Sequence, residues 1–339
     1  MKAAKVTAPY KVEFEERPMP TFGDDQVLLK ILAFGICGSD MQIYHGQHPV
    51  AQYPLVMGHE VSAVVDKVGK NVTDYKPGDK VTIEPQVFCG HCKPCREGRF
   101  NVCEDIRVMG VYMDGCNCEY FACDARYLHH VPDFLTDEQI ALVEPLSVGV
   151  GSVKRSRMYK GGNVVVVGAG TIGNCAAQAA KGLGAGKVLV TDIVDSKLEY
   201  ALECGIDYAF NTSKMTLSEA IEKAFGEDKA DVIIDCAAVP PVFKSIIEAA
   251  RPNSEIILTG SYKTPVTFEV PRVQRREISL IGHFMYVRED FADAIRLLSE
   301  GKITITKTVS QVYPFDKYDE ALKFFDEHPD QVMKIIVKM

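Results

Sequence analysis

Two patterns of apolar and polar positions divide the sequence near residue 145. Up to that point, short runs in which apolar and polar residues alternate are broken by turn residues. Such alternation is typical of half-buried antiparallel strands. The clearest runs cover residues 27–32, 61–68 and 79–83. The first part of the chain is therefore predicted to form a partly open antiparallel β-barrel that carries its polar groups on loops.

The second pattern consists of continuous apolar runs separated by amphipathic stretches. The runs cover residues 164–168, 188–192, 232–236, 256–260 and 279–282, and helical periodicity is clearest over 173–183 and 196–204. Strands that are buried on both faces lose the polar alternation, so this pattern predicts a doubly wound parallel α/β domain. Two further helices, at 290–299 and 316–326, and a strand at 333–338 are expected near the end of the chain.

Length and composition are those of a two-domain globular protein. The chain has 339 residues, of which 47% are hydrophobic and 25% charged, and chains of this length usually divide into two cores. The net charge of −8 argues against a nucleic-acid partner, which usually needs a basic patch. The sequence has no run of about eighteen apolar residues and no apolar leader, so neither a membrane span nor a signal peptide is expected. Eleven cysteines without such a leader indicate a reducing compartment, and we expect the cytoplasm.

Four thiols that lie close together in the sequence indicate a structural zinc site. Cys89, Cys92, Cys95 and Cys103 are separated by two, two and seven residues. Thiolates two residues apart can point at one ion across a tight turn, and four of them complete a closed tetrahedral zinc site. An iron–sulfur cluster is the alternative, but the bacterial ferredoxin spacing has a shorter last gap and a final proline, where this chain has Glu104. Buried thiols without a ligand are the remaining explanation.

A glycine-rich turn between a predicted strand and a predicted helix indicates a dinucleotide site. The turn has the form G-x-G-x-x-G, in which the candidate residues are Gly168, Gly170, Thr171, Ile172 and Gly173. Glycines there allow a tight turn and a close approach of the backbone to a pyrophosphate at the helix N-terminus. Asp192 ends the next strand and can accept hydrogen bonds from both ribose hydroxyls, which favours NAD over NADP, although Lys197 nearby weakens that preference. A glycine turn without a ligand is the alternative.

A second, more open candidate metal site comprises a cysteine, a histidine and two glutamates. Cys37 lies in Cys-Gly-Ser-Asp, His59 and Glu60 lie in Gly-His-Glu, and Glu144 precedes Pro145. A thiolate, an imidazole and a carboxylate leave one tetrahedral position for water or a substrate oxygen, as catalytic zinc requires. Each residue alone could instead be a core thiol, a loop histidine or a helix-side acid. Their occurrence beside a four-thiol site and a dinucleotide turn favours the metal site.

These motifs together carry a resemblance to a known family. Over essentially its whole length, the chain resembles the zinc-dependent medium-chain alcohol dehydrogenases, and among them the polyol branch of sorbitol, L-idonate, sugar-acid and threonine dehydrogenases. The resemblance implies a GroES-like catalytic domain of residues 1–147 and 287–339, a Rossmann domain of residues 148–286, and a site in the cleft between them. It also implies two zinc ions per chain, NAD as cofactor and a homodimer or homotetramer. In this branch the glutamate on the catalytic zinc varies, so Glu60 and Glu144 both remain candidates.

Two positions depart from the polyol pattern. Relatives often read Cys-Gly-Ser/Thr-Asp-x-His, whereas this chain has Gln42 where the proton-relay histidine would stand. His45 is a candidate substitute, and a surface histidine is the simpler explanation for it. Sorbitol dehydrogenases carry an arginine at the position of Met285, so strict sorbitol specificity is not expected.

We therefore expect an enzyme that transfers hydride from a secondary alcohol of a polyol or sugar acid to NAD and leaves a ketone. Cys37, His59 and a glutamate would hold the zinc that lowers the pKa of the substrate hydroxyl, and Ser39 would accept its proton. The expected substrates are similar to sorbitol, L-idonate, L-gulonate or L-galactonate. L-Threonine 3-dehydrogenase or a butanediol dehydrogenase is the alternative within this class. A non-catalytic nucleotide-binding protein on the same fold is the alternative from a different class.

Overall fold

The computed structural model describes residues 1–339, apart from the side chain of Thr306, and its contacts divide the chain into two units. The first unit comprises Met1–Glu144 and Thr308–Met339, and the second comprises Pro145–Lys307. The predicted boundary at 286/287 would place helix α10 (Arg288–Ser299) in the first unit. In the structure α10 packs against α5 (Thr171–Gly182), where Leu297 lies against Gly182, and therefore belongs to the second unit.

A seven-stranded sheet forms the frame of the first unit. Its order is β16-β17-β3-β4-β5-β9, and β8 pairs with β3 beside this path. The hairpin β1-β2 and the short pair β6-β7 complete the strands of this unit. The strands are β1 (Lys2–Ala8), β2 (Lys11–Glu16), β3 (Gln26–Ile36), β4 (Val61–Val68), β5 (Lys80–Ile83), β6 (Gln86–Val87), β7 (Arg107–Val108), β8 (Tyr120–Asp124), β9 (Leu128–His130), β16 (Val309–Pro314) and β17 (Lys334–Lys338). The helices are α1 (Gly38–Tyr44), α2 (Lys93–Arg96), α3 (Asp137–Ala141) and α11 (Tyr318–Glu327), and α4 (Val143–Lys154) begins here.

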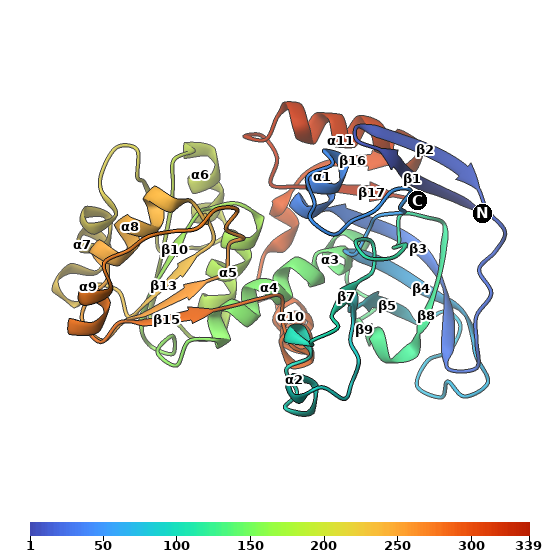
Figure 1. The fold of residues 1–339 in the computed structure, drawn as a ribbon, viewed down its shortest axis with the longest axis horizontal. Coiled ribbons are helices and arrows are strands. Elements are labelled where there is room, and N and C mark those ends of the chain that lie inside the picture. The colour runs from blue at the N-terminus through green and yellow to red at the C-terminus, as the bar shows by residue number, and fades with distance from the viewer. The chain divides into compact units, whose positions relative to one another are not determined.

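The C-terminal segment is an integral part of the first unit. Strand β17 pairs antiparallel with β3, with Ile336 opposite Gly35, so the last residues of the chain lie beside an early strand (Figure 1). Phe34 on β3 packs edge-on against Phe315 and Tyr318, which precede and begin α11. This apolar core fixes the end of β3, where the first candidate site residues follow.

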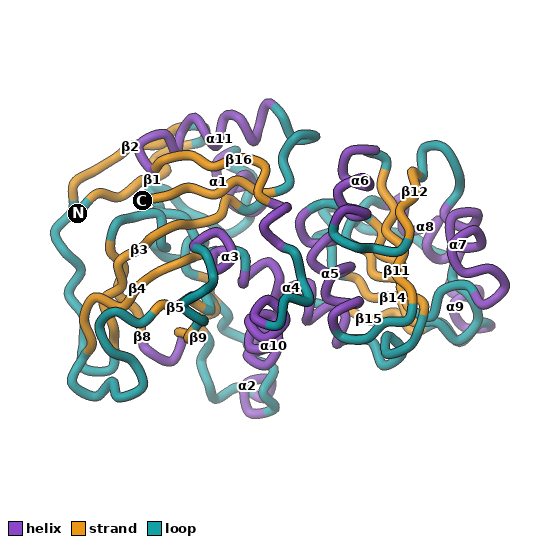
Figure 2. Tube along the Cα trace, turned by 180° about the vertical axis from the view of Figure 1, so that it is seen from behind, coloured by secondary structure: helices purple, strands orange, loops and turns teal.

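The second unit is the doubly wound parallel domain that the sequence predicts. Its sheet has the order β12-β11-β10-β13-β14-β15, and every neighbouring pair is parallel. Helix α5 covers one face, and α7 and α8 cover the other (Figure 2). The remaining bounds are β10 (Asn163–Val167), β11 (Lys187–Asp192), α6 (Asp195–Glu203), β12 (Tyr208–Asn211), α7 (Leu217–Phe225), β13 (Val232–Asp235), α8 (Pro240–Ala249), β14 (Glu255–Leu258), α9 (Val270–Arg275) and β15 (Ser279–Gly282). Short 3-10 helices lie at Phe100–Val102, Ala125–Tyr127, Gly226–Asp228, Ile305–Thr308 and Phe315–Lys317.

Candidate zinc sites and nucleotide site

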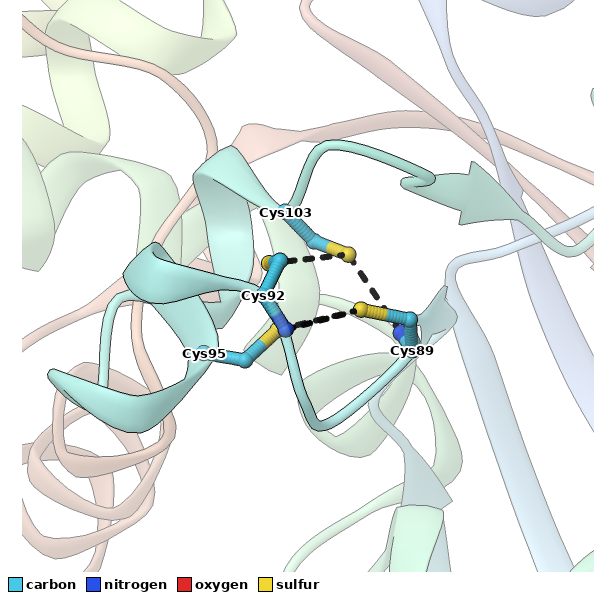
Figure 3. A group of neighbouring side chains, drawn as sticks. All are labelled: Cys89, Cys92, Cys95 and Cys103. Carbon is cyan, nitrogen blue, oxygen red and sulfur yellow. Dashed lines mark hydrogen bonds between the residues drawn. The ribbon is translucent and has the colours of Figure 1, made fainter.

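The four thiols predicted to hold structural zinc converge on one point (Figure 3). Their sulfur atoms all lie within 4.8 Å of one another. The Sγ atoms of Cys89 and Cys95 are 4.0 Å apart, and those of Cys92 and Cys103 are 3.8 Å apart. A zinc–sulfur bond of about 2.3 Å gives a tetrahedron with edges of about 3.8 Å. The cluster therefore has the dimensions of a tetrahedral zinc site.

Backbone N–H groups donate hydrogen bonds to sulfur atoms of this cluster. Cys92 N donates to Cys89 Sγ over 3.4 Å, and Cys89 N donates to Cys103 Sγ over 3.3 Å. The backbone N–H groups of His91 and Cys92 lower the pKa of Cys89 to about 6, whereas burial raises the pKa of Cys95 to about 12. Cys89 and Cys95 therefore ionise unequally, and a divalent ion bound by the cluster would stabilise its thiolates.

The second candidate metal cluster lies where β3 ends and β4 begins. Cys37 directly follows β3, and His59 and Glu60 directly precede β4, whose Val61 pairs with Phe34 of β3. Antiparallel pairing thus brings the three residues together, and their candidate ligand atoms lie within 4.8 Å of one another. His59 and Glu60 are buried, and Cys37 is partly exposed. A thiolate, an imidazole and a carboxylate in this arrangement can hold one metal ion and leave a position open.

Asp40 orients the imidazole of His59. Its Oδ2 accepts a hydrogen bond from Cys37 N at 2.8 Å, and its Oδ1 lies 3.6 Å from His59 Nδ1. His59 Nε2 is thereby left for a metal and lies 3.5 Å from Ser39 Oγ. Burial opposes the charge on His59, but Asp40, Cys37 and Glu144 outweigh it and raise the pKa of His59 well above its ordinary value. A carboxylate behind a metal-binding histidine is a common supporting contact, and the Cys-Gly-Ser-Asp spacing was the signal from which this role could have been inferred.

Lys334 holds the carboxylate of Glu60. Its Nζ lies 2.6 and 2.7 Å from the two carboxylate oxygens and 3.1 Å from the carbonyl of Ile36. Burial disfavours the lysine charge, but Glu60 outweighs burial and raises the pKa of Lys334. Glu144, in the first turn of α4, is also buried, and its charge raises the pKa values of both His59 and Lys334. Sequence reasoning did not identify Lys334.

His45 does not face this cluster as a relay would. Its Nε2 lies 2.8 Å from Asp326 Oδ1 on α11, and its ring packs beside those of Tyr10 and Tyr44. The simpler explanation, a histidine in the surface region, fits this environment. Gln42 lies in the middle of α1 and is partly buried.

The glycine turn in the second unit leaves free space at Gly170 and is tightly packed at Gly173. Gly168 directly follows β10 and adopts φ +97°, which favours glycine. A Cβ at Gly173 would lie 1.8 Å from the carbonyl oxygen of Gly168, so only glycine permits helix α5 to start this close to the strand. Gly170 is the N-cap of α5, and a Cβ there would meet no atom within 4 Å. Thr171 and Ile172 form the first turn of α5, and the N-terminus of a helix is suited to bind a phosphate.

Asp192 is fixed beside this turn at the end of β11. Its Oδ2 accepts a hydrogen bond from Ala169 N and its Oδ1 accepts one from Ile193 N, each over 2.7 Å. Lys197 lies partly buried on α6. Beyond Asp192, a hollow of about 650 Å³ is lined by residues that include Thr191, Ile193, Thr212, Ser213, Pro241 and Val242. The sequence does not indicate this hollow, because its walls come from separate segments.

Comparisons with known proteins agree with this architecture. Residues 23–133 match the family "Alcohol dehydrogenase GroES-like domain", and residues 171–300 match the family "Zinc-binding dehydrogenase". The chain is 30% identical to a sorbitol dehydrogenase of Bacillus subtilis, over 99% of this chain and 97% of that protein. It is 32% identical to the alcohol dehydrogenase rspB of Escherichia coli CFT073, solved with NADH, with a TM-score of 0.93 over 100% and 99% of the two chains. An L-idonate 5-dehydrogenase structure from Escherichia coli is 26% identical, with a TM-score of 0.90 over 100% and 99%.

The GroES-like unit, the parallel nucleotide-binding unit and the two ligand clusters define a zinc-binding dehydrogenase. The chain belongs to the zinc-containing medium-chain alcohol dehydrogenase family, which confirms the resemblance and the fold class inferred from the sequence. Among the described helices, none combines the length and the hydropathy that a membrane span requires.

Proposed function

We propose that this protein oxidises a secondary alcohol of a polyol or sugar acid to a ketone with NAD as the hydride acceptor. The observation that carries the proposal is the cluster of Cys37, His59 and Glu60, which offers three ligand atoms within 4.8 Å of one another. Three protein ligands with one open position are typical of catalytic zinc, whereas the four-thiol cluster is closed and would be structural.

Cys37, His59 and Glu60 would hold the catalytic ion, with Glu144 as the alternative carboxylate, and the four clustered thiols would hold the second ion. A zinc ion at the open site would polarise the substrate oxygen and favour loss of the hydroxyl proton. Asp40 keeps the His59 ring in one orientation. Ser39 Oγ, next to His59 Nε2, is placed to accept the hydroxyl proton.

The glycine turn, Asp192 and the adjoining hollow would bind the cofactor. The pyrophosphate would lie on the N-terminus of α5, the ribose hydroxyls would donate to Asp192, and the hollow would take the adenine. Asp192 would repel a 2′-phosphate, which supports NAD over NADP. NAD supplies the hydride-accepting nicotinamide. The related rspB structure contains NADH, which supports the same choice here.

The substrate class rests on the relatives and on the site chemistry. Sorbitol and L-idonate dehydrogenases are among the similar proteins, and Met285 stands where sorbitol dehydrogenases carry arginine, which favours a substrate other than sorbitol itself. Eleven free cysteines, five of them in the two candidate zinc clusters, fit a reducing compartment such as the cytoplasm. A homodimer or homotetramer is proposed from the family.

Formation of NADH by the zinc-loaded protein tests the proposal directly. The panel comprises sorbitol, xylitol, L-idonate, L-gulonate, L-galactonate, L-threonine and 2,3-butanediol, each with NAD and with NADP. We expect preferential turnover of a polyol or hexonate with NAD. Preferential turnover of threonine or butanediol would show that the substrate is not a polyol or sugar acid and would favour the threonine or butanediol dehydrogenase alternative. Binding of NADH without turnover of any alcohol would favour a non-catalytic nucleotide-binding protein.

A further inference from the structure

The strand order of the parallel sheet reverses between β10 and β13. From β10 the chain adds β11 and β12 on one side, and it then crosses to the other side to add β13, β14 and β15. In such sheets a dinucleotide lies across the carboxyl ends of the strands at this reversal. Asp192 and the adjoining hollow would take the adenosine half on the β11 side. The nicotinamide half would therefore lie on the other side, over the turns that follow β13 and β14.

The turn after β13 has a backbone conformation that needs support. Ala238 adopts φ +53°, in the left-handed region that a residue with a Cβ occupies only at a cost. A Cβ at Gly168 would lie 3.1 Å from Ala237 N, and a Cβ at Gly260 would lie 2.7 Å from the Cβ of Ala238. The turn therefore lies between the glycine turn that follows β10 and the chain that follows β14, and its shape affects both neighbours.

The carboxylate of Asp235 holds this turn. Asp235 is the last residue of β13 and is completely buried. Its Oδ1 accepts hydrogen bonds from Ala237 N over 3.0 Å and from Ala238 N over 3.1 Å. Its backbone carbonyl accepts two more, from Thr259 N over 3.0 Å and from Gly260 N over 2.8 Å. One residue thus fixes both the turn after β13 and the start of the segment after β14.

Tyr262 orients the second oxygen of this carboxylate. Its hydroxyl donates a hydrogen bond to Asp235 Oδ2. Burial and then this hydrogen bond raise the pKa of Tyr262, so the hydroxyl keeps its proton and remains a donor at neutral pH. The tyrosine ring packs edge-on against Phe243 of α8, with ring centroids 6.0 Å apart. Because packing fixes the ring, the hydroxyl can set the direction of the buried carboxylate.

We propose that Tyr262 and Asp235 are positioning residues for the nicotinamide half of the cofactor. The inference rests on the proposed function, since it takes NAD to bind at the reversal of strand order. Tyr262 fixes the carboxylate of Asp235, and that carboxylate holds Ala238 in its left-handed conformation. The turn formed by residues 236–239 thereby keeps the shape that the cofactor meets beside the glycine turn. Both side chains act through the backbone of this turn and not on the reacting atoms.

The test compares Tyr262→Phe with Tyr208→Phe in the zinc-loaded protein. Tyr262→Phe loses only the hydroxyl that reaches Asp235, whereas Tyr208 begins β12 at one edge of the sheet. Calorimetric titration measures the affinity for NADH and for ADP, which carries the adenosine and two phosphates without the nicotinamide half. NADH affinity of Tyr262→Phe should fall about tenfold, because a hydrogen bond to a buried charge is lost. ADP affinity should keep the wild-type value, and Tyr208→Phe should bind both ligands as the wild-type protein does.

A second substitution, Ala238→Gly, separates positioning from a general loss of structure. Glycine adopts φ +53° without steric cost, so it needs no carboxylate to hold it there. Added to Tyr262→Phe, Ala238→Gly should therefore restore most of the NADH affinity. Unchanged NADH affinity in Tyr262→Phe, an equal loss of NADH and ADP affinity, or a double variant that binds NADH no better would each overturn the inference. Failure of the proposed function is a different result, in which the wild-type protein binds NADH but oxidises no alcohol.

Discussion

Lys334 and Glu60 form a buried ion pair across 274 residues of sequence, with both carboxylate oxygens within 2.7 Å of the lysine Nζ. Lys334 begins the C-terminal strand β17, and Glu60 belongs to the candidate catalytic cluster. Both side chains are almost fully buried, at 4% and 1% exposure. The end of the chain therefore supplies the cation that neutralises a carboxylate at the metal site.

Replacement of Lys334 by methionine should destabilise the first unit. It would leave Glu60 charged, buried and unpaired, which costs about 3–5 kcal/mol. Lys338→Met is the control, because Lys338 lies on the same strand but pairs with Glu138 near the surface. Urea unfolding of the zinc-free proteins measures the difference, because a zinc ion held by Glu60 would itself neutralise the carboxylate. The pKa of Lys334 is raised, so its contribution should be complete at neutral pH and be lost only as pH rises above the ordinary lysine pKa towards the raised value. Equal stability of the two variants would contradict the role of this pair.

Glu60→Gln and Glu144→Gln should differ in their effect on zinc. Glu60 lies within the ligand cluster with Cys37 and His59, whereas the charge of Glu144 is among the influences that raise the pKa of His59. We expect Glu60→Gln to reduce zinc affinity by about 10- to 100-fold or more, and Glu144→Gln to retain zinc with a smaller loss. Elemental analysis after dialysis against a weak chelator checks this. A larger loss of zinc affinity in Glu144→Gln than in Glu60→Gln would show that Glu144 is the third ligand.

The thiols of the structural cluster should react unequally once zinc is removed. Cys89, whose pKa is lowered to about 6, should be alkylated by iodoacetamide at a rate that rises up to about pH 6 to 7 and then levels off. Cys95, whose pKa is raised to about 12, should react slowly and still accelerate at pH 9. Peptide mapping by mass spectrometry after brief chelation gives both rates. Zinc-loaded protein should be protected at both positions, and equal rates at Cys89 and Cys95 would contradict these ionisation states.

Asp192→Ser should shift cofactor preference towards NADP. The substitution removes the carboxylate that would repel a 2′-phosphate, and a change of about 1.4 kcal/mol would alter the ratio of kcat/KM values tenfold. Asp192 also accepts hydrogen bonds from Ala169 N and Ile193 N, so KM for NAD should rise as well. Asp195→Ser is the control, because Asp195 is exposed at the start of α6. If the ratio of the kcat/KM values for NAD and NADP were unchanged, Asp192 would not determine cofactor preference.

The parts of the fold with a strong local pattern could be predicted from the sequence. The apolar runs at 164–168 and 232–236 correspond to β10 and β13, because buried parallel strands need apolar side chains on both faces. Strand β12 (Tyr208–Asn211) gives no such signal, since it is a short edge strand with partly buried residues. The Lys334–Glu60 pair could not be predicted either. It depends on tertiary contacts, and a single lysine in a sequence usually indicates a surface residue.

Metal content and NADH formation by Cys37→Ala test the central claim most directly. Cys37 supplies the thiolate of the open cluster and takes no part in the four-thiol cluster. The wild-type protein should contain two zinc ions per chain, and Cys37→Ala should contain one, should still bind NADH, and should form no NADH from the alcohol that the wild-type protein oxidises. A Cys37→Ala protein that keeps both zinc ions and the wild-type rate would show that this cluster is not the catalytic metal site.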